Sequence, residues 1–403
     1  MTKGKRMEVE IRLGSVRYPF RLGTDCLGAI VEDLVAMSAS RFLIVCDSNT
    51  GPLFGAELVE RLSPRVPANL LIHRAGEPYK DLQAVGTLAD SALQLGADRA
   101  SVVVAVGGGV IGNIAGLMAA LLFRGIRLVH VPTSLIAMSD SVLSLKQAVN
   151  ACVGKNLMGT FYAPESVLAD TAMLRSLPFR ETVSGLCEVV KNSLAIRPSM
   201  VEMLRTSLRQ DACYDDETMY EIISESILAK ASVTEDDMHE CRAGLVLEYG
   251  HTVGHAIEYT AAGGLSHGQA IGLGMVVAAE VSHRLGHLDQ EAVALHRELL
   301  TRAGAMVTIP EEVDLDEVMH RLRFDNKRGY LADPAESSAM VLLGGLGDPL
   351  WHDGRPLVSV PMALVGEVIN EIARPEIPNF ELVAPVGTVE EGRVPDTVGA
   401  ADG

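Results

Sequence analysis

Two histidines and one glutamate, far apart in the sequence, lie in segments whose residue types suit a single divalent metal ion. His251 lies in Glu-Tyr-Gly-His-Thr-Val-Gly-His, His267 in Leu-Ser-His-Gly-Gln-Ala, and Glu188 in Gly-Leu-Cys-Glu-Val-Val-Lys-Asn. Two imidazoles and one carboxylate form a ligand set that suits Zn or Co, and three protein ligands leave a coordination position open for a substrate. Helix capping or a polar core is the alternative role for these histidines. The glycine-flanked histidine segments and the acidic helix motif together favour the metal site.

The spacing within the second of these segments suggests a different pair of ligands. His251 and His255 are four residues apart, so they share one face of a helix, which is the usual way for two histidines to chelate one metal. Glu248 precedes His251 by three residues. On a helix covering 243–260 it would lie on the same face, where it could act as a general base.

A glycine-rich segment follows the apolar run Ser-Val-Val-Val-Ala-Val at 101–106 and opens a helix. Gly108, Gly109 and Gly112 would let the backbone approach a pyrophosphate, and the helix N-terminus would supply amide donors. The pattern differs from the G-x-G-x-x-G fingerprint of dinucleotide-binding folds. Tight packing of the strand on the helix could also account for the glycines.

A lysine stands in an apolar frame a little further along the chain. Lys146 follows Val-Pro-Thr-Ser, with Thr133 and Ser134, and it also follows Asp140. A charged lysine in such surroundings must find an anion or shift its pKa. A phosphate, a cofactor or an internal salt bridge would each supply that anion.

Composition narrows the class of protein. The chain has 403 residues with 48% hydrophobic and 21% charged residues, which is typical of a globular protein of two domains or one large one. The formal net charge of −18 argues against nucleic acid or an anionic membrane as the main partner. An anionic small-molecule substrate would need a local basic pocket.

The cysteines and the apolar segments bear on location. Six cysteines are scattered without C-x-x-C spacing, which is simplest to explain by reduced thiols in a cytoplasmic protein. No run of 18 apolar residues occurs, and the N-terminus lacks a secretory core. We therefore expect a cytoplasmic location.

Strand-like and helix-like segments alternate in the first part of the chain. Apolar runs at 41–46, 101–106 and 126–131 are separated by helical stretches such as 82–96 and 113–122. This order predicts an α/β domain over 1–180, Rossmann-like, with a mostly parallel sheet covered on both faces. Ligands of such sheets bind outside the carboxyl ends of the strands, where Asp47 and Gly107–Gly109 fall.

Long helical periodicities dominate after residue 180. They predict an all-helical domain over 181–373 that binds the metal and the substrate, followed by a flexible tail over 374–403. The expected helices cover 181–195, 198–208, 215–233, 243–260, 268–286 and 289–303.

Taken together, these segments resemble the dehydroquinate synthase-like sugar phosphate cyclases from about residue 10 to about residue 370. The motifs that carry the resemblance are Gly-Gly-Gly-Val-Ile-Gly-Asn, Phe-Arg-Gly-Ile with Val-Pro-Thr-Ser, Gly-Lys-Asn, Glu-Val-Val-Lys, Gly-His-Thr-Val-Gly-His-Ala-Ile-Glu and Ser-His-Gly. The resemblance implies Glu188, His251 and His267 as metal ligands, which displaces the pairing of His251 with His255. His255 then faces the substrate.

Departures from the dehydroquinate synthase pattern point to a branch of this family. Dehydroquinate synthases carry an arginine and an asparagine where this chain has Gly244 and Glu248. Arginine suits a substrate carboxylate through a bidentate contact, so its replacement by glycine implies a substrate without that carboxylate. The segments around Lys146, Glu248 and Lys327 resemble the branch that cyclises D-glucose 6-phosphate in 2-deoxystreptamine aminoglycoside antibiotic biosynthesis. Cyclases of sedoheptulose 7-phosphate and 3-dehydroquinate synthase itself are the alternatives within the family.

The resemblance also implies roles for further residues. NAD would be a recycled cofactor that oxidises and later reduces C4 of the sugar, with phosphate lost between the two steps. Lys146, Glu248 and His255 would be catalytic. The residues expected to contact NAD are Asp47, Glu77, Lys80, Gly108, Gly109, Gly112, Asn113, Thr133, Ser134, Asp140, Lys146 and Lys155. Those expected to hold the substrate are Arg124, Asn156, Lys191, Lys230 and Lys327.

The family pattern places the counterpart of Arg124 near the site of a neighbouring subunit, which implies a homodimer. Two other activities remain open at this point. A metal-dependent polyol dehydrogenase has a similar glycine-rich loop and helical metal domain. A non-catalytic relative that binds nucleotide sugars would not need Lys146, Glu248 or the metal ligands.

Overall fold

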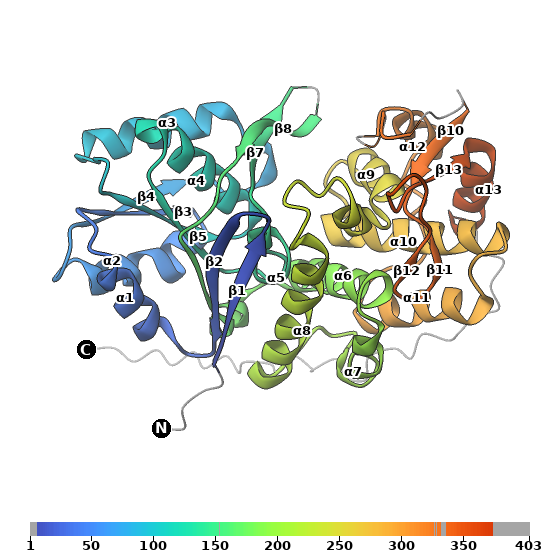
Figure 1. Cartoon of the computed structure of the whole chain (residues 1–403), viewed down its shortest axis with the longest axis horizontal. Coiled ribbons are helices and arrows are strands. Elements are labelled where there is room, and N and C mark those ends of the chain that lie inside the picture. Colours follow the sequence, from blue (N-terminus) through green and yellow to red (C-terminus); the bar gives the residue numbers. More distant parts are fainter. Residues whose placement is uncertain (1–5, 153, 326, 328, 332–335, 374–403) are drawn as a thin grey trace, which may run out of the picture.

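The chain forms an α/β half and a helical half that lie side by side (Figure 1). The computed structural model describes residues 6–152, 154–325, 327, 329–331 and 336–373. The tail expected over 374–403 lies outside the described residues. Among the residues that are described, no helix combines the length and the apolar character needed to cross a membrane.

A seven-stranded sheet forms the centre of the first half, in the order β1-β2-β9-β6-β5-β3-β4. All neighbouring strands are parallel except β1 and β2, which form an antiparallel hairpin. The strands are β1 (Arg6–Leu13), β2 (Val16–Gly23), β3 (Phe42–Asp47), β4 (Ala68–His73), β5 (Val102–Gly107), β6 (Arg127–Pro132) and β9 (Ser166–Asp170). The strands predicted at 41–46, 101–106 and 126–131 are therefore confirmed.

Helices cover both faces of this sheet, because its central strands are apolar on both sides. Val102 and Val104 of β5 pack into the core that contains helices α1 (Leu27–Ala36) and α2 (Ala56–Leu62). Val103, on the opposite face of the same strand, packs with α3 (Leu82–Gln94) and α4 (Gly109–Leu121). This alternation is the two-residue period of a strand, and burial on both faces is typical of parallel sheets.

The second half is helical and is built around α10 (His267–Arg284), which packs against α6, α9, α11 and α13. The other helices are α6 (Phe179–Ala195), α7 (Val201–Ser207), α8 (Asp216–Thr234), α9 (His251–Thr260), α11 (Gln290–Arg302), α12 (Leu315–Leu322) and α13 (Met362–Ala373). The helical character is confirmed. This half also contains two short antiparallel strand pairs that were not predicted: β10 (Ser337–Met340) with β13 (Val358–Pro361), and β11 (Leu343–Gly345) with β12 (Asp348–Pro349).

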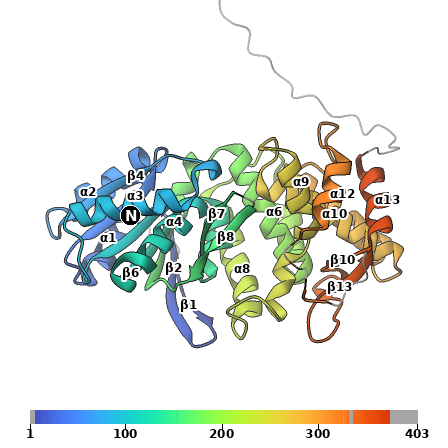
Figure 2. The same cartoon turned by 90° about the horizontal axis from the view of Figure 1, so that it is seen from above.

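A separate hairpin and several short helical turns complete the fold. Strands β7 (Lys146–Ala151) and β8 (Gly154–Phe161) pair with each other and not with the large sheet. They lie at the boundary between the two halves (Figure 2). The short segments are α5 (Leu135–Ser139), η1 (Gly51–Gly55), η2 (Glu77–Tyr79), η3 (Leu122–Arg124), η4 (Ser141–Leu143), η5 (Thr171–Ser176), η6 (Pro198–Met200) and η7 (Ala243–Glu248).

The single helix predicted over 243–260 is wrong. The chain forms η7, then bends at Gly250, where φ is +80°, and α9 begins at His251. A Cβ atom at Gly250 would lie 2.6 Å from Met275 Cγ and 2.8 Å from the Ile271 carbonyl oxygen, so α10 packs directly against the bend. Glycine tolerates both the left-handed conformation and this close approach. Glu248 therefore does not share a helix face with His251, contrary to the prediction.

Candidate active site

Glu188, His251 and His267 converge from three different helices. Glu188 lies in the middle of α6 and is buried, while His251 and His267 are the first residues of α9 and α10. Oε1 of Glu188 lies 3.7 Å from Nε2 of His251 and 3.5 Å from Nε2 of His267. The three groups thus point toward one another, as a shared cation would require.

Close helix packing brings His267 to Glu188. A Cβ atom at Gly268 would lie 1.9 Å from the backbone oxygen of Ser184, so only glycine allows α10 to approach α6 this closely. The Gly268 amide donates to Ser184 Oγ at 3.0 Å. Ser184 lies one turn before Glu188 on the same helix.

Hydrogen bonds orient both imidazoles so that Nε2 faces Glu188. Nδ1 of His251 lies 3.1 Å from the backbone oxygen of Tyr249, and Nδ1 of His267 lies 3.0 Å from Oε2 of Glu258. Acceptors at Nδ1 hold a proton on that nitrogen, so a metal ion would bind at Nε2, in place of any proton there.

The state of Glu188 fits a cation at this position. Nζ of Lys191 lies 2.5 Å from its Oε2, but neither carboxylate oxygen accepts a well-formed hydrogen bond from the described residues. Burial raises the pKa of Glu188, but the ammonium group of the adjacent Lys191 lowers it, and the pKa lies well below its usual value. A buried, ionised carboxylate with free lone pairs beside two imidazoles is a donor set that suits Zn or Co.

His255 belongs to the same cluster. One ring nitrogen from each of His251, His255 and His267 can be chosen so that all three lie within 4.8 Å of one another. The spacing-based pairing of His251 with His255 is therefore geometrically possible, as is the set implied by the family. Burial lowers the pKa of His255 to about 3, so its imidazole is neutral and can accept or donate a proton.

The predicted catalytic residue Glu248 lies beside this cluster, at the end of η7. Its Oε2 lies 3.1 Å from Nζ of Lys327, which also contacts Asp325 at 3.1 Å. Burial raises the pKa of Glu248, but the ammonium groups of Lys327 and Lys146 lower it, and the pKa lies well below its usual value. The group is therefore an ionised carboxylate that can accept a proton.

Lys146, at the start of β7, finds its anion within the protein. Its Nζ donates to Oε2 of Glu240 at 2.6 Å, in the loop after α8. Of the alternatives left open by the sequence, the internal salt bridge is present in the structure. The Lys146 side chain is nevertheless 46% exposed, so its ammonium group remains accessible to a ligand.

Three more predicted residues form a polar group near Glu188. Nζ of Lys230, on α8, donates to Oδ1 of Asp140 at 2.8 Å and to its backbone oxygen at 2.9 Å. Burial raises the pKa of Asp140, but Lys230 and Lys191 lower it further than burial raises it. Lys191 and Lys230 thus supply positive charge close to the histidine cluster in a protein that is acidic as a whole.

Residues predicted to contact the cofactor line the carboxyl ends of the strands. Asp47 ends β3, next to β5, and accepts from the amides of Asn49 and Thr50 at 2.9 and 2.8 Å. Gly108 precedes α4, and a Cβ atom there would meet Ser134 Oγ at 3.2 Å. Gly109 and Gly112 lie in the first turn of α4, and Thr133 lies in the connection between β6 and α5. The strand order reverses between β3 and β5, which is where such sheets bind their ligands.

The η2 turn and the β7–β8 hairpin bring further predicted residues together. Nζ of Lys80 donates to Oδ1 of Asn156 at 2.5 Å, and Nδ2 of Asn150 donates to Oε1 of Glu77 at 2.9 Å. Burial lowers the pKa of Lys80. Lys155, next to Asn156, donates to Oε1 of Glu258 at 2.6 Å.

Two predicted residues have surroundings that the sequence did not indicate. Asn113 donates to the Gly109 oxygen at 2.9 Å and accepts from the Ala148 amide at 2.9 Å, so its side chain ties α4 to β7. Arg124, in η3, lies in a cavity of about 390 Å³ formed by α4 and β8 with Leu121, Met158 and others. The residues lining that cavity do not include the histidine cluster.

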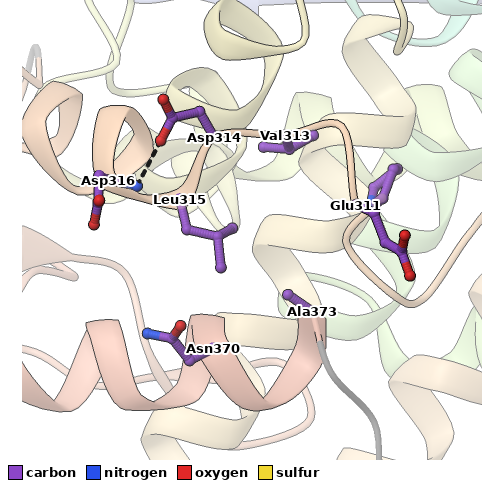
Figure 3. A pocket seen from close by; sticks show the side chains of 8 residues that line it. Glu311, Val313, Asp314, Leu315, Asp316, Asn370 and Ala373 are labelled. Carbon is purple, nitrogen blue, oxygen red and sulfur yellow. Dashed lines mark hydrogen bonds between the residues drawn. The ribbon is translucent and has the colours of Figure 1, made fainter.

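A larger hollow of about 760 Å³ lies elsewhere in the helical half (Figure 3). It is formed by the start of α12 and the end of α13, and its lining includes Glu311, Asp314, Asp316, Asn370 and Ala373. None of the predicted site residues lines it. Its carboxylates would repel a sugar phosphate, so we do not assign it to the active site.

Two family models match consecutive parts of the chain. The model of the 3-dehydroquinate synthase N-terminal domain matches residues 70–184, and the model of the C-terminal domain matches residues 185–328. The chain belongs to the dehydroquinate synthase family. The family resemblance of its motifs and the predicted fold class are thereby confirmed.

Individual relatives narrow the assignment within the family. A 2-deoxy-scyllo-inosose synthase of Micromonospora echinospora is 98% identical over 397 residues, which cover 98% of this chain and 100% of that protein. One of Streptoalloteichus tenebrarius is 58% identical over 364 residues, which cover 90% and 94%. A crystal structure of a 2-deoxy-scyllo-inosose synthase complexed with carbaglucose-6-phosphate, NAD+ and Co2+ has a TM-score of 0.86 and 38% identity, covering 91% of this chain and 100% of the other. Within the family, the chain groups with these enzymes.

The sequence did not indicate the partners of several site residues. Glu258 contacts both His267 and Lys155, and Glu240 contacts Lys146. Glu258 could have been suspected, because it lies three residues after His255 on the same helix. Glu240 could not, because its partner is 94 residues away in the sequence.

Proposed function

We propose that this chain uses NAD and one divalent metal ion to convert D-glucose 6-phosphate into 2-deoxy-scyllo-inosose with release of phosphate. The observation that carries the proposal is the convergence of Glu188, His251 and His267 on one point beside the ionised carboxylate of Glu248. The 98% identity to a 2-deoxy-scyllo-inosose synthase supports the choice of substrate and product. So does the related structure with bound carbaglucose-6-phosphate, a carbocyclic analogue of glucose 6-phosphate.

The two bound groups would supply redox and Lewis-acid chemistry at C4 of the sugar, namely hydride exchange and polarisation of the C4 oxygen. Glu188, His251 and His267 would hold the metal. Co and Zn both suit these ligands, and the related structure contains Co2+.

The chain's own residues would move protons and hold the sugar phosphate. We assign Glu248 as a base, because its carboxylate is ionised although it is buried. Lys146 would act as its proton-transfer partner, and neutral His255 would contact a substrate hydroxyl. Lys191, Lys230 and Lys327, with Asn156, would hold the phosphate and the remaining hydroxyls, since ammonium and amide groups donate well to such oxygens.

NAD would bind across the carboxyl ends of β3 and β5. Asp47, at the end of β3, would accept hydrogen bonds from ribose hydroxyls. The backbone amides of the turn at Gly108 and Gly109, at the start of α4, would donate to the pyrophosphate. Lys80 and Lys155 would add positive charge from the η2 turn and the β7–β8 hairpin.

We assign the role to aminoglycoside antibiotic biosynthesis in the cytoplasm. All six cysteines are free, which suits a reducing compartment.

We also propose that the chain divides into two functional domains at residue 180. This residue follows β9, the last strand of the large sheet along the chain, and lies in the first turn of α6. Residues 1–180 would bind NAD, and residues 181–373 would bind the metal and substrate.

We propose further that the enzyme is a homodimer that uses the face around Arg124. Leu121, Leu82 and Met158 are 56%, 49% and 37% exposed and line the same cavity as Arg124. An apolar patch that includes an arginine is a common composition of an interface core. Leu121→Asp should shift the sedimentation of the protein from dimer to monomer, whereas Leu285→Asp, at an exposed position at the end of α10, should not. A wild-type protein that sediments as a monomer would refute the dimer.

Phosphate release with two sugar phosphates tests the function itself. Incubated with NAD and Co2+, the protein should release phosphate from D-glucose 6-phosphate, and not from sedoheptulose 7-phosphate at a comparable rate. NADH absorbance should not rise with product, because the cofactor is recycled. Preferential turnover of sedoheptulose 7-phosphate would identify the other cyclase, and NADH formed in proportion to product would identify a dehydrogenase.

A further inference from the structure

Glu258 is the residue that joins the metal cluster to the other half of the molecule. It lies near the end of α9, and its side chain is only 12% exposed. One carboxylate oxygen accepts from Nδ1 of His267 at 3.0 Å, and the other accepts from Nζ of Lys155 at 2.6 Å. The same carboxylate therefore contacts a proposed metal ligand and the β7–β8 hairpin.

We propose that Glu258 is a positioning residue that fixes the orientation of His267 and couples metal binding to the position of the β7–β8 hairpin. The proposal rests on the metal site described above. It adds a role for a residue that contacts neither the metal position nor the reacting atoms.

The geometry explains how Glu258 would act on His267. His267 is the first residue of α10, and its side chain is 34% exposed, so packing alone does not immobilise the ring. A carboxylate at Nδ1 holds the proton on that nitrogen and directs Nε2 toward Oε1 of Glu188. Carboxylates that orient metal-binding histidines in this way also raise the basicity of the ring as a ligand.

The position of the hairpin depends on contacts with both halves, and Asn113 and Lys80 hold it on the side of the α/β half. It does not join the large sheet. Besides Lys155–Glu258, it contacts the helical half through the ion pair of Lys146 with Glu240 and through the rings of Phe161 and His239, whose centroids are 4.5 Å apart. The same hairpin carries the proposed catalytic Lys146, so its position matters for the reaction.

Two consequences follow from the shared carboxylate. Removing Glu258 should weaken metal binding even though all three ligands are present. Filling the metal site should also stabilise the hairpin, because coupling between two binding events is reciprocal.

Cobalt affinity tests the first consequence, measured by competition with a chelator at saturating NAD. Glu258→Ala should bind Co2+ about 10- to 100-fold more weakly than wild type, the usual range for loss of an orienting partner. Glu258→Gln keeps an oxygen acceptor but loses the charge, so its affinity should lie between the two. The visible absorption spectrum of bound Co2+ should also change, since it reports ligand geometry.

Glu280→Gln is the matched control. Glu280 lies on α10 and pairs with Arg284, away from the cluster, so the Co2+ affinity of this variant should equal that of wild type.

The outcomes distinguish a failure of the positioning role of Glu258 from a failure of the proposed metal site. If wild type binds no Co2+, the metal site itself is wrong. If wild type binds Co2+ and Glu258→Ala, with unchanged circular dichroism, binds it equally well, the positioning role is wrong. Should Glu258→Ala fail to fold, the nearly isosteric Glu258→Gln decides: an affinity and spectrum identical to wild type would overturn the proposal.

Hydrogen exchange tests the second consequence. In wild type, Co2+ should slow amide exchange in residues 154–161 of β8. In Lys155→Met, which keeps the length of the side chain but not its charge, the effect of Co2+ on these amides should be much smaller. An equal slowing in both proteins, or none in wild type, would show that the hairpin is not coupled to the metal through this contact.

Discussion

His267→Ala is expected to purify without stoichiometric metal, whereas wild type should contain one Co or Zn ion per chain. The substitution removes one of three proposed ligands and leaves a cavity open to water at the start of α10. The loss of affinity should exceed the roughly 100-fold that removal of an outer hydrogen-bond partner can cost. Elemental analysis after dialysis against trace metal measures the content directly.

His283→Ala provides the matched control for this experiment. His283 lies on the same helix, and its Nδ1 hydrogen-bonds to the Leu288 oxygen at 2.8 Å, outside the metal cluster. That variant should keep its metal. Full metal content in His267→Ala would reject His267 as a ligand and favour a site that uses His255 instead.

Glu248→Gln is expected to lose cyclisation while it retains both metal and NAD. The carboxylate is ionised because nearby ammonium groups, above all that of Lys327, outweigh the effect of burial on its pKa. Glutamine has nearly the same shape but cannot accept a proton. Loss of a general base typically costs about 10²- to 10⁴-fold in rate. Phosphate release under saturating substrate measures the effect, and equilibrium binding of Co2+ and NAD shows that the site is otherwise intact.

Glu298→Gln controls for the change of charge in the helical half. Glu298 pairs with Arg205 and Arg302 at the surface of α11, so its loss should leave turnover unchanged. Substantial residual turnover in Glu248→Gln would remove Glu248 from the mechanism. Loss of metal from that variant would instead assign it a structural role at the site.

The sequence was sufficient to predict the parallel sheet and most helices, because their apolar periodicities are long and regular. Val102 to Val106 reads as a strand buried on both faces, and the structure has this strand. The short strands β10 to β13 were missed, since segments of two to four residues carry too little periodicity to be recognised. The β7–β8 hairpin was missed because its polar and glycine residues are typical of a binding loop.

The break before α9 shows where local pattern fails. The apolar spacing continues from Leu245 to Ile257, so a single helix was the natural prediction. The bend at Gly250 is decided by α10, which packs against it, and such tertiary contacts have no local signal. The bend changes the site, because it separates Glu248 from the helix of His251 and places it beside Lys327.

The site residues also show what local sequence patterns predict and what only tertiary contacts decide. Residue types pointed to Glu188, His251 and His267, spacing paired His251 with His255, and the family resemblance decided for the first set. The structure brings all four side chains together, so distance alone does not select the ligand set. The contacts of Lys155 with Glu258 and of Lys146 with Glu240 join segments that are 103 and 94 residues apart in the chain, and they could be found only in the folded protein.

Anomalous diffraction at the cobalt edge, from crystals grown with NAD and Co2+, tests the central claim most directly. We predict one strong peak per chain, bonded to the Glu188 carboxylate and to Nε2 of His251 and His267, with metal–nitrogen distances of about 2.0–2.2 Å. A peak that excludes Glu188, or no peak among these three side chains, would contradict the account.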